Sequence, residues 1–418
     1  MKISILKTLT LTLLGALSAS ALNTFAASLT VSGSTLEESD KSYDDSNGEV
    51  PALSVTSAGH YSGTNITLNT YRNGGYMAEG GYGARVNGWG NVSTLSLTDS
   101  TIHTAGASAP GIYLPGGLGV LNNVNITTEG DGSYGIRVQQ VSDFTTLTSG
   151  TIRTAGAYAS GINLETGGVA LNGVDIETTG DDSHGVEMYW SATLTLTDSA
   201  ISATGNSTYG LRLVGNNNQV DLNHSTLTGS AGSIYIPEGN VAVMTITGSN
   251  GSVITGDVVA TNYNNTRVDI TLTGADTALH GDFIQNSIPI VLTLTLGADA
   301  LFHGGGELDI LTVESGAILG YTDGLFVTGE ITIGDNITID LSSLTETDNY
   351  LVLDWTGASG GDAISGDQFI IAGAGVEGTF SVANNQLYFN ATAVPEPSTW
   401  FLFGAALGVL ALIRRQTK

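Results

Sequence analysis

The chain has no cysteine, and only 12 of its 418 residues are lysine or arginine, against 39 aspartates and glutamates. Without cysteine, no disulfide can stabilise the fold, so a packed core must do so. Five basic residues lie in terminal segments that we expect to be removed, and the remaining body then carries a net charge of about −31. Such a body has no basic patch that could displace counterions, which excludes nucleic acid and anionic lipid as its partners.

Proline and charge are also scarce. Prolines number 7 and charged residues make up 12% of the chain, whereas glycines number 57. This composition is too apolar for a disordered chain. It is typical of a protein made of short strands and turns. Divalent cations could screen the acidic surface, but the composition requires no metal site and no cofactor.

One short pattern, a small residue followed by apolar-x-apolar, recurs along residues 95–239. Its first apolar residues are 24, 26, 24, 25 and 23 positions apart. The alternation indicates a strand with one buried face. The copies are Gly111-Ile112-Tyr113-Leu114, Gly135-Ile136-Arg137-Val138, Gly161-Ile162-Asn163-Leu164, Gly185-Val186-Glu187-Met188, Gly210-Leu211-Arg212-Leu213 and Ser233-Ile234-Tyr235-Ile236. A second column stands about nine or ten residues upstream and consists of Ile102, Ile126, Ile152, Ile176 and Ile201.

A repeat this short cannot close a core of its own, so its copies must stack and bury each other's apolar faces. The pattern therefore predicts an all-β fold, a right-handed parallel β-helix with one coil per repeat. We expect the glycine that opens most copies to supply a positive φ where the coil turns. An antiparallel β-sandwich also has short strands and frequent turns, but it gives no reason for a repeat of 23–26 residues.

Units such as Ser133-Tyr134-Gly135-Ile136 and Ala159-Ser160-Gly161-Ile162 resemble the pertactin-type passenger domains of bacterial autotransporters. The resemblance lies in the style of the repeat and covers roughly residues 55–391. It implies an elongated β-helix that stands outside the cell.

The chain divides into five segments on sequence grounds. Residues 1–27 have the charged start, short apolar run and small-residue cleavage site of a signal peptide, which predicts an N-terminal signal helix. Residues 28–54 are acidic and serine-rich and are expected to cap the first coil, with calcium binding as a weaker alternative. Residues 55–343 form the β-helix, 344–392 a C-terminal β cap, and 394–418 a sorting signal. An expanded loop at 71–76, near Arg85 and Trp89, is a candidate for glycan stacking or an ordinary surface loop.

The middle residues of the repeated pattern should form an outward ladder, one residue per coil. These residues are Tyr113, Arg137, Asn163, Glu187, Arg212 and Tyr235. Because adjacent coils lie about 4.8 Å apart, arginine and glutamate would be neighbours there. We expect weak surface ion pairs from them rather than a catalytic group.

The C-terminal tail carries the candidate functional residues, in three parts. A polar motif is followed by a short apolar stretch, predicted as a short transmembrane helix, and by a basic stop. The motif is Val394, Pro395, Glu396, Pro397, Ser398 and Thr399; the apolar stretch includes Trp400, Phe401, Leu402, Phe403, Leu407, Val409, Leu410, Leu412 and Ile413; the stop is Arg414, Arg415 and Lys418. The two prolines should hold the motif extended and open to an enzyme.

This tail resembles the PEP-CTERM sorting signal in all three parts. The resemblance implies export, a transient stay in the inner membrane, and cleavage by an exosortase-type enzyme. Release to the cell surface or exopolysaccharide matrix would follow. The alternative is a plain C-terminal membrane anchor.

No catalytic or metal-binding constellation stands out. The histidines lack metal-ligand spacing, although His280 and His303 could lie side by side in adjacent coils. The nucleophile-elbow and dinucleotide patterns at 357–361 and 373–378 open no helix and are chance matches in a glycine-rich chain.

The preferred function is a structural or adhesive role without enzymatic activity, with extracellular polysaccharide as a candidate ligand. The first alternative is a polysaccharide-cleaving enzyme, but Arg137, Arg153 and Arg212 fall in different columns or coils. The second is an ice-binding protein, because Thr-x-Thr pieces recur. Their spacings of 52, 26 and 22 residues do not predict a continuous array, and threonine is a common strand residue.

Overall fold

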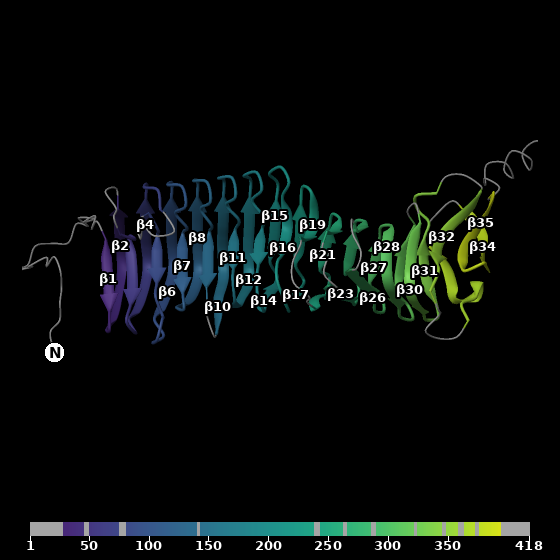
Figure 1. Ribbon diagram of the computed structural model, residues 1–418, viewed down its shortest axis with the longest axis horizontal. Coiled ribbons are helices and arrows are strands. Elements are labelled where there is room, and N and C mark those ends of the chain that lie inside the picture. The colour runs from purple at the N-terminus through teal and green to yellow at the C-terminus, as the bar shows by residue number, and fades with distance from the viewer. Residues whose placement is uncertain are drawn as a thin grey trace, which may run out of the picture.

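The computed structural model describes residues 28–45, 50–74, 81–139, 143–237, 243–261, 266–285, 290–321, 324–344, 348–357, 363–372 and 376–393. These residues form one rod of stacked coils (Figure 1). The fold is an all-β, right-handed parallel β-solenoid, as predicted, with almost no helix. The signal peptide and the sorting signal lie outside the described residues, so the two predicted terminal helices remain predictions.

Three parallel ladders of strands make up the rod. The first ladder contains one short strand per coil, and each pairs with the equivalent strand of the next coil. Its short members are β1 (Leu29–Ser32), β3 (Leu53–Thr56), β5 (Ala84–Val86), β7 (Ile112–Pro115), β9 (Ile136–Gln139), β11 (Ile162–Leu164), β13 (Val186–Met188), β16 (Tyr209–Leu213), β19 (Gly232–Ile236), β22 (Val258–Ala260) and β25 (Phe283–Gln285). The ladder continues through the first residues of two longer strands, β28 (Gly306–Val313) and β30 (Leu325–Ile333).

In the first coils, one long strand bends at a corner and supplies both the second and the third ladder. These strands are β2 (Thr35–Asp45), β4 (His60–Thr70), β6 (Thr94–Thr104), β8 (Leu118–Thr128), β10 (Phe144–Thr154) and β12 (Gly167–Thr178). The corner residue has a left-handed φ and is mostly Asp or Asn, which tolerate that conformation. The corner side chains also bond between coils: Asn65 Nδ2 donates to Asp40 Oδ1 at 2.7 Å, and Asn123 Nδ2 donates to Asp99 Oδ1 at 2.7 Å.

Beyond β12 the long strand divides. The second ladder continues as β14 (Ala192–Thr197), β17 (Gln219–Asn223), β20 (Val243–Ser249), β23 (Thr266–Thr273), β26 (Ile290–Leu296), β28 (Gly306–Val313) and β30 (Leu325–Ile333). The third continues as β15 (Ala200–Ala203), β18 (Thr226–Gly229), β21 (Val253–Thr255), β24 (Ala278–His280), β27 (Leu301–His303), β29 (Ile318–Gly320), β31 (Ile337–Asp340) and β33 (Phe369–Ala372).

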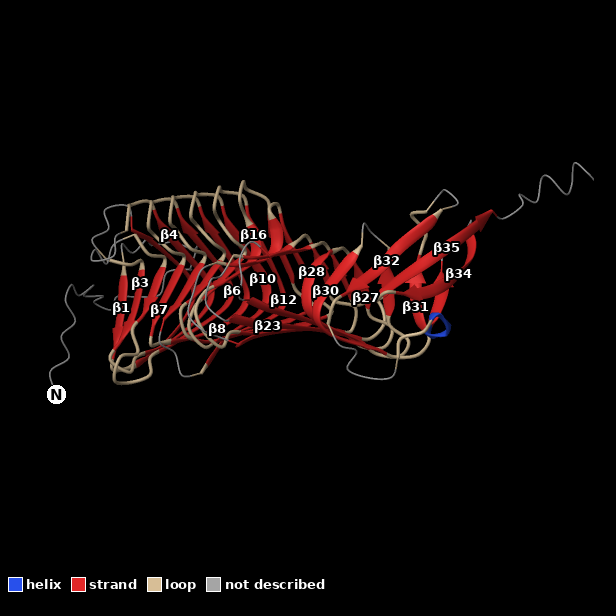
Figure 2. Ribbon diagram, turned by 45° about the vertical axis from the view of Figure 1, so that its right-hand side comes forward, coloured by secondary structure: helices blue, strands red, loops and turns tan. Residues whose placement is uncertain are grey.

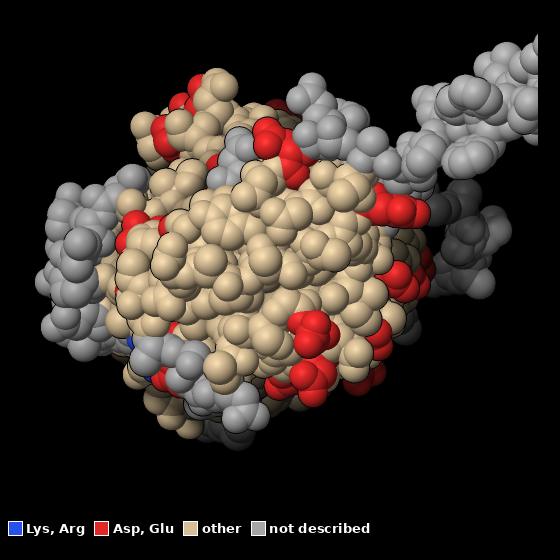
Figure 3. All heavy atoms as spheres, turned by 90° about the vertical axis from the view of Figure 1, so that its right-hand side faces the viewer, with Lys and Arg blue, Asp and Glu red and all other residues tan. Residues whose placement is uncertain are grey.

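The far end changes from parallel to antiparallel pairing. There β32 (Asn349–Trp355) pairs with β35 (Gln386–Ala393), which also pairs with β34 (Val376–Ala383). The short 3₁₀ helix η1 (Gly366–Gln368) precedes β33. Seen end-on, this end presents mostly uncharged residues, with acidic residues toward its rim (Figure 3).

The predicted isoleucine column forms the centre of the core. Ile102, Ile126, Ile152, Ile176 and Ile201 pair in register through consecutive coils, and all five are buried. Each side chain therefore rests on the one below it. A solenoid of this kind removes apolar surface from water only through its neighbours, which is why the repeat must be kept over many coils.

The repeat glycines have a different role from the one predicted. Gly111, Gly135, Gly161, Gly185 and Gly210 do not have a positive φ, so that prediction is wrong. A Cβ on Gly135 would lie 2.2 Å from Cγ2 of Ile152 and 2.6 Å from the carbonyl oxygen of Gly161. The position requires glycine because the isoleucine of the same coil fills the space of the missing side chain.

The left-handed residues lie in the preceding turns instead. In one such turn, Ser108 has a φ of 53° and in the next Gly132 has a φ of 64°. Buried hydroxyls satisfy the turn backbone: Ser133 Oγ donates to the Gly106 carbonyl at 2.8 Å and accepts the Ala109 N–H at 2.9 Å. Figure 2 shows these turns as a regular row along one edge of the rod.

Candidate functional site

One outward position of the first ladder collects polar and aromatic side chains in register. Its members are Arg85, Tyr113, Arg137, Asn163, Glu187, Arg212 and Tyr235, and we call this column the polar face. The predicted ladder from Tyr113 to Tyr235 is therefore confirmed. Asn163 is only 3% exposed and Glu187 only 8%. The expectation of exposed, weak ion pairs is wrong at these positions.

Glu187 is a buried carboxylate held from both sides along the column. Its Oε1 accepts a hydrogen bond from Arg212 Nη1 of the next coil at 3.2 Å. Its Oε2 accepts one from Asn163 Nδ2 of the preceding coil at 3.1 Å. Burial raises the pKa of Glu187, while the positive charge of Arg212 and the two hydrogen bonds oppose that rise. A carboxyl group with such opposed influences is a candidate functional group.

A second ion pair joins Arg137 to Glu165, which follows β11. Arg137 Nε donates to Glu165 Oε1 at 3.0 Å, and both side chains are about four-fifths buried. Burial by itself would lower the pKa of Arg137, but the hydrogen bond and charge of Glu165 raise it. The guanidinium carbon also lies 5.3 Å from the ring centre of Tyr113, a cation–π contact.

His184 comes from the turn before β13 and is buried beside Glu187. Burial and the nearby charge of Arg212 lower its pKa to about 4. Its Nδ1 accepts the N–H of Tyr209 at 3.2 Å, and its Nε2 lies 3.9 Å from Glu187 Oε1. At neutral pH the imidazole is therefore uncharged, and it orients Tyr209 rather than completing an ion pair.

Aromatic rings border the polar face along its length. Burial raises the pKa of Tyr134 to about 12 and that of Tyr189 in the same direction, so both phenols remain protonated. Two ring pairs connect coils, Tyr82 with Tyr113 at 5.7 Å and Tyr209 with Tyr235 at 4.6 Å between centroids. Within one coil, the rings of Tyr189 and Trp190 lie 6.0 Å apart. The face thus combines planar charged groups with aromatic rings, the combination that suits a hydroxyl-bearing ligand.

Sequence reasoning missed four members of this site, although their position in the repeat was a usable signal. Tyr134 and His184 each stand directly before the repeat glycine, and Glu165 and Tyr189 each stand two residues after the polar-face residue of their coil. Side chains at equal phase of a solenoid repeat lie on one face. Arg137 and Arg212 share the polar face, as predicted, but stand in coils that are not adjacent, and Arg153 lies on the third ladder.

The sequence-predicted site residues, 394–418, all lie outside the described residues, so the structure places none of them. Among the residues that it does describe, no helix is long and apolar enough to cross a bilayer.

The histidine pair is confirmed as a pair. His280 and His303 are register partners in adjacent coils, with ring centres 5.9 Å apart. Burial and the neighbouring His303 lower the pKa of His280. No group of three or more potential metal ligands occurs in the described part of the chain, so the pair has no third ligand there.

Threonines do form a continuous column, which their sequence spacing did not predict. Thr247, Thr271, Thr295, Thr312 and Thr332 are register partners through five successive strands of the second ladder. The neighbouring column, two residues earlier, contains Thr245, Asp269, Thr293, Ile310 and Glu330. One regular column beside a mixed one does not make a flat threonine array, so ice binding gains no support.

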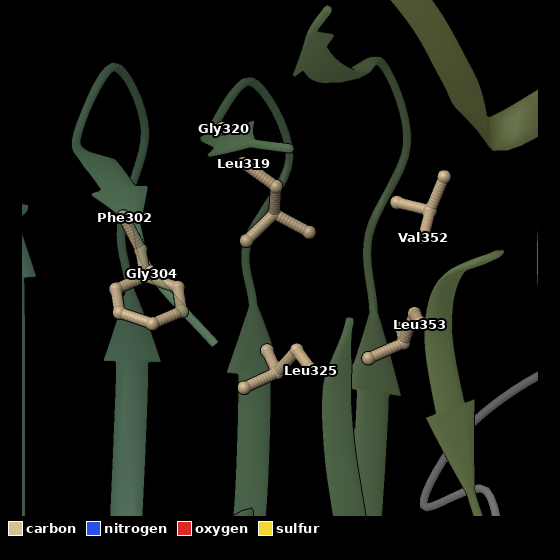
Figure 4. Close-up of a pocket in the computed structure, with 7 residues that line it drawn as sticks. All are labelled: Phe302, Gly304, Leu319, Gly320, Leu325, Val352 and Leu353. Carbon is tan, nitrogen blue, oxygen red and sulfur yellow. The ribbon is translucent and has the colours of Figure 1, made fainter. Parts of the chain in front are cut away.

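A small pocket lies between the last coils (Figure 4). It is lined by Phe302, Gly304, Leu319, Gly320, Leu325, Val352 and Leu353. All of these are apolar or glycine, so the pocket offers no side chain that could orient a polar ligand. It is an imperfection of packing where the parallel coils meet β32.

Comparison with known proteins identifies the tail. Residues 393–416 match the PEP-CTERM protein-sorting motif. This motif implies an exported protein that an exosortase-type enzyme processes. No curated protein matches the chain.

Two solved structures resemble the rod. The autotransporter UpaB from E. coli strain CFT073 is 14% identical, with a TM-score of 0.46, and the match covers 88% of this chain and 100% of that one. A chain of the Vag8–C1 inhibitor complex is 15% identical, with a TM-score of 0.38, and the match covers 82% of this chain and 97% of that one. At these values no conclusion about function follows.

Proposed function

We propose that the chain is an exported β-solenoid that is cleaved at Pro395-Glu396-Pro397 by an exosortase-type enzyme and delivered to the cell surface or exopolysaccharide matrix. The observation that carries this proposal is the match of residues 393–416 to the PEP-CTERM sorting motif. The acidic body fits it as well, because self-repulsion keeps such a rod soluble outside the cell.

Within the matrix, the proposed role is structural and adhesive, with extracellular polysaccharide as the ligand. A rod of stacked coils presents one side face over its whole length. Weak contacts at several points of one polymer then add up to firm attachment without a deep pocket. The polar face supports this role, since charged and aromatic side chains are held there in register over consecutive coils.

The competing function is cleavage of polysaccharide. Glu165 and Glu187 could supply the two carboxyl groups that glycoside hydrolysis requires. Each carboxyl group instead forms an ion pair with an arginine of a neighbouring coil, at 3.0 Å and 3.2 Å, so one oxygen of each is already engaged and does not face a glycosidic bond. We therefore propose a binding protein. Incubation with polysaccharides and an assay for new reducing ends tests this. If the wild-type chain releases reducing ends, cleavage becomes the preferred function and binding the alternative.

The sorting step is tested by replacing Pro395, Glu396 and Pro397 with alanine. We expect the full-length chain to accumulate in the inner-membrane fraction, while the wild type appears at the surface in a shortened form. A matched control replaces Ser342 and Ser343 with alanine, because both are exposed and lie outside the matched residues, and this variant should reach the surface like the wild type. Surface delivery of the triple variant at the wild-type level would show that the motif is not the sorting signal.

A further inference from the structure

The charged groups of the polar face are not needed to stack the coils. At the same position further along the ladder, Tyr235 pairs with Val259, and Val259 pairs with Ile284. An apolar residue therefore suits this position of the coil. Yet two consecutive coils carry Asn163 and Glu187, whose burial removes them from water at a cost in solvation. Replacing such buried ion pairs by apolar residues is often neutral or stabilising, so their presence points to a ligand.

The cluster also contains a polar atom without a partner. Asn163 Oδ1 is buried and has no hydrogen-bond partner among the described residues, although the Nδ2 of the same amide donates to Glu187. Buried amide oxygens are nearly always bonded in a finished protein interior. A shift of this amide on ligand binding would give the oxygen its missing donor. A hydroxyl group of a ligand is such a donor.

The composition of the cluster selects the class of ligand. Carboxylate, amide and guanidinium groups are each planar and present adjacent acceptors or donors, which suit neighbouring hydroxyls. Trp190 is 52% exposed and its ring lies 6.0 Å from that of Tyr189 at the edge of the cluster. Such a ring offers an apolar surface to the C–H face of a sugar.

Charge decides between a neutral and an anionic sugar. Arg137 and Arg212 are each paired with a glutamate, so the cluster carries little net charge of its own. The body around it is strongly negative. An acidic polysaccharide would be repelled by this field, whereas a neutral one would not be affected by it.

We infer that Arg137, Asn163, Glu165, Glu187, Tyr189 and Arg212 form a binding subsite for a neutral, hydroxyl-rich polysaccharide, with Trp190 stacking on one sugar ring. This inference rests on the proposed adhesive function and names its ligand class. It places the contact on the first ladder, across β9, β11, β13 and β16.

The test uses the full-length chain in mild detergent and follows tryptophan fluorescence and calorimetric heat. The probes are soluble oligosaccharides of a neutral glucan and a neutral mannan, and oligogalacturonate as the anionic counterpart. We expect a neutral probe to bind and oligogalacturonate not to bind. Trp190→Ala removes an exposed ring without touching the core, and it should weaken binding about tenfold. Glu187→Gln should weaken it further.

The matched control is Arg153→Ala. Arg153 forms an ion pair with Glu177 at 3.0 Å, but on the third ladder and with both side chains about half exposed. It should leave glycan affinity unchanged. The inference is overturned if neither neutral probe binds, if oligogalacturonate binds more tightly, or if Trp190→Ala and Glu187→Gln bind like the wild type. None of these outcomes bears on surface delivery, which the sorting variants test separately.

Discussion

Glu187 and Arg212 occupy the same position in consecutive coils, and Arg212 Nη1 lies 3.2 Å from Glu187 Oε1. The pair joins β13 to β16 through side chains in addition to the backbone ladder. Since Glu187 is almost fully buried, its charge depends on Arg212 more than an exposed carboxylate would. The consequences for stability, backbone packing and pH response can each be measured.

Removing the cation should expose that dependence. Arg212→Ala leaves a buried carboxylate without its main counter-charge, which we expect to lower the free energy of unfolding by about 3 kcal/mol. The loss should be larger at pH 8 than at pH 5, because protonation relieves an unpaired carboxylate whose pKa is raised. Urea denaturation at the two pH values measures this.

The comparison variant is Arg153→Ala, whose ion pair with Glu177 is about half exposed. Removal of a pair in that setting should change the free energy of unfolding by less than about 1 kcal/mol at either pH. If Arg212→Ala and Arg153→Ala lower the free energy of unfolding equally, the buried pair at Glu187 contributes no more to stability than an exposed pair.

Gly135→Ala tests why the repeat glycine is required. The new Cβ would lie 2.2 Å from Cγ2 of Ile152, and overpacking of this kind should cost about 1–3 kcal/mol. Adding Ile152→Ala removes the clashing methyl group, so the double variant should be less destabilised than the sum of the two single variants. Thermal unfolding of the four proteins completes the cycle.

Gly90→Ala measures the cost of a positive φ at a position where the new Cβ meets no steric clash. Gly90 has a φ of +82°, and a Cβ there would meet nothing within 4 Å. The substitution should lower the free energy of unfolding by about 1 kcal/mol, the strain of a left-handed non-glycine residue. A second substitution in a neighbouring side chain should not restore this loss. If position 135 required glycine because of its φ, Ile152→Ala would likewise fail to restore stability to the Gly135→Ala variant.

Ser133→Ala tests the turn. Loss of its hydroxyl leaves the Ala109 N–H and the Gly106 carbonyl without their bonds to Ser133 Oγ in a buried turn. We expect a loss of about 1–3 kcal/mol, against almost none for Ser62→Ala, because Ser62 is exposed on β4. Equal melting temperatures for the two variants would mean that water replaces the hydroxyl in the turn.

The sequence predicted the solenoid because its periodicity has a simple physical origin. An isoleucine every 24 to 26 residues can be buried only by another copy of itself, and Ile126 does lie between Ile102 and Ile152. The role of Gly135 could not be predicted in the same way. Its constraint arises from Ile152, which lies 17 positions further along and touches it only after the coil has closed.

The buried ion pairs were also beyond prediction, for a related reason. The spacing placed Asn163, Glu187 and Arg212 in one column, and the register confirms it. Their burial depends on neighbouring side chains from other parts of the coil, such as His184, whose Nε2 lies 3.9 Å from Glu187 Oε1. The alternation of a strand does not predict such contacts. The repeat spacing therefore predicted correctly which residues are neighbours in the column, but not that they are buried.

The response to acid provides the last prediction, through His184. Its pKa of about 4 in the folded protein is below the value of 6.5 for an unperturbed histidine. As pH falls through 6.5, the unfolded chain takes up the proton first. The stability that comes from an uncharged His184 is therefore complete above pH 6.5 and is lost progressively toward pH 4, by up to about 3 kcal/mol.

His184→Asn keeps an acceptor for the Tyr209 N–H and cannot titrate, so its free energy of unfolding should fall less steeply over this range. The difference between the two slopes, measured by urea denaturation, isolates His184 from the carboxyl groups that titrate in both proteins. Parallel curves for His184→Asn and the wild type would show that His184 is not held uncharged.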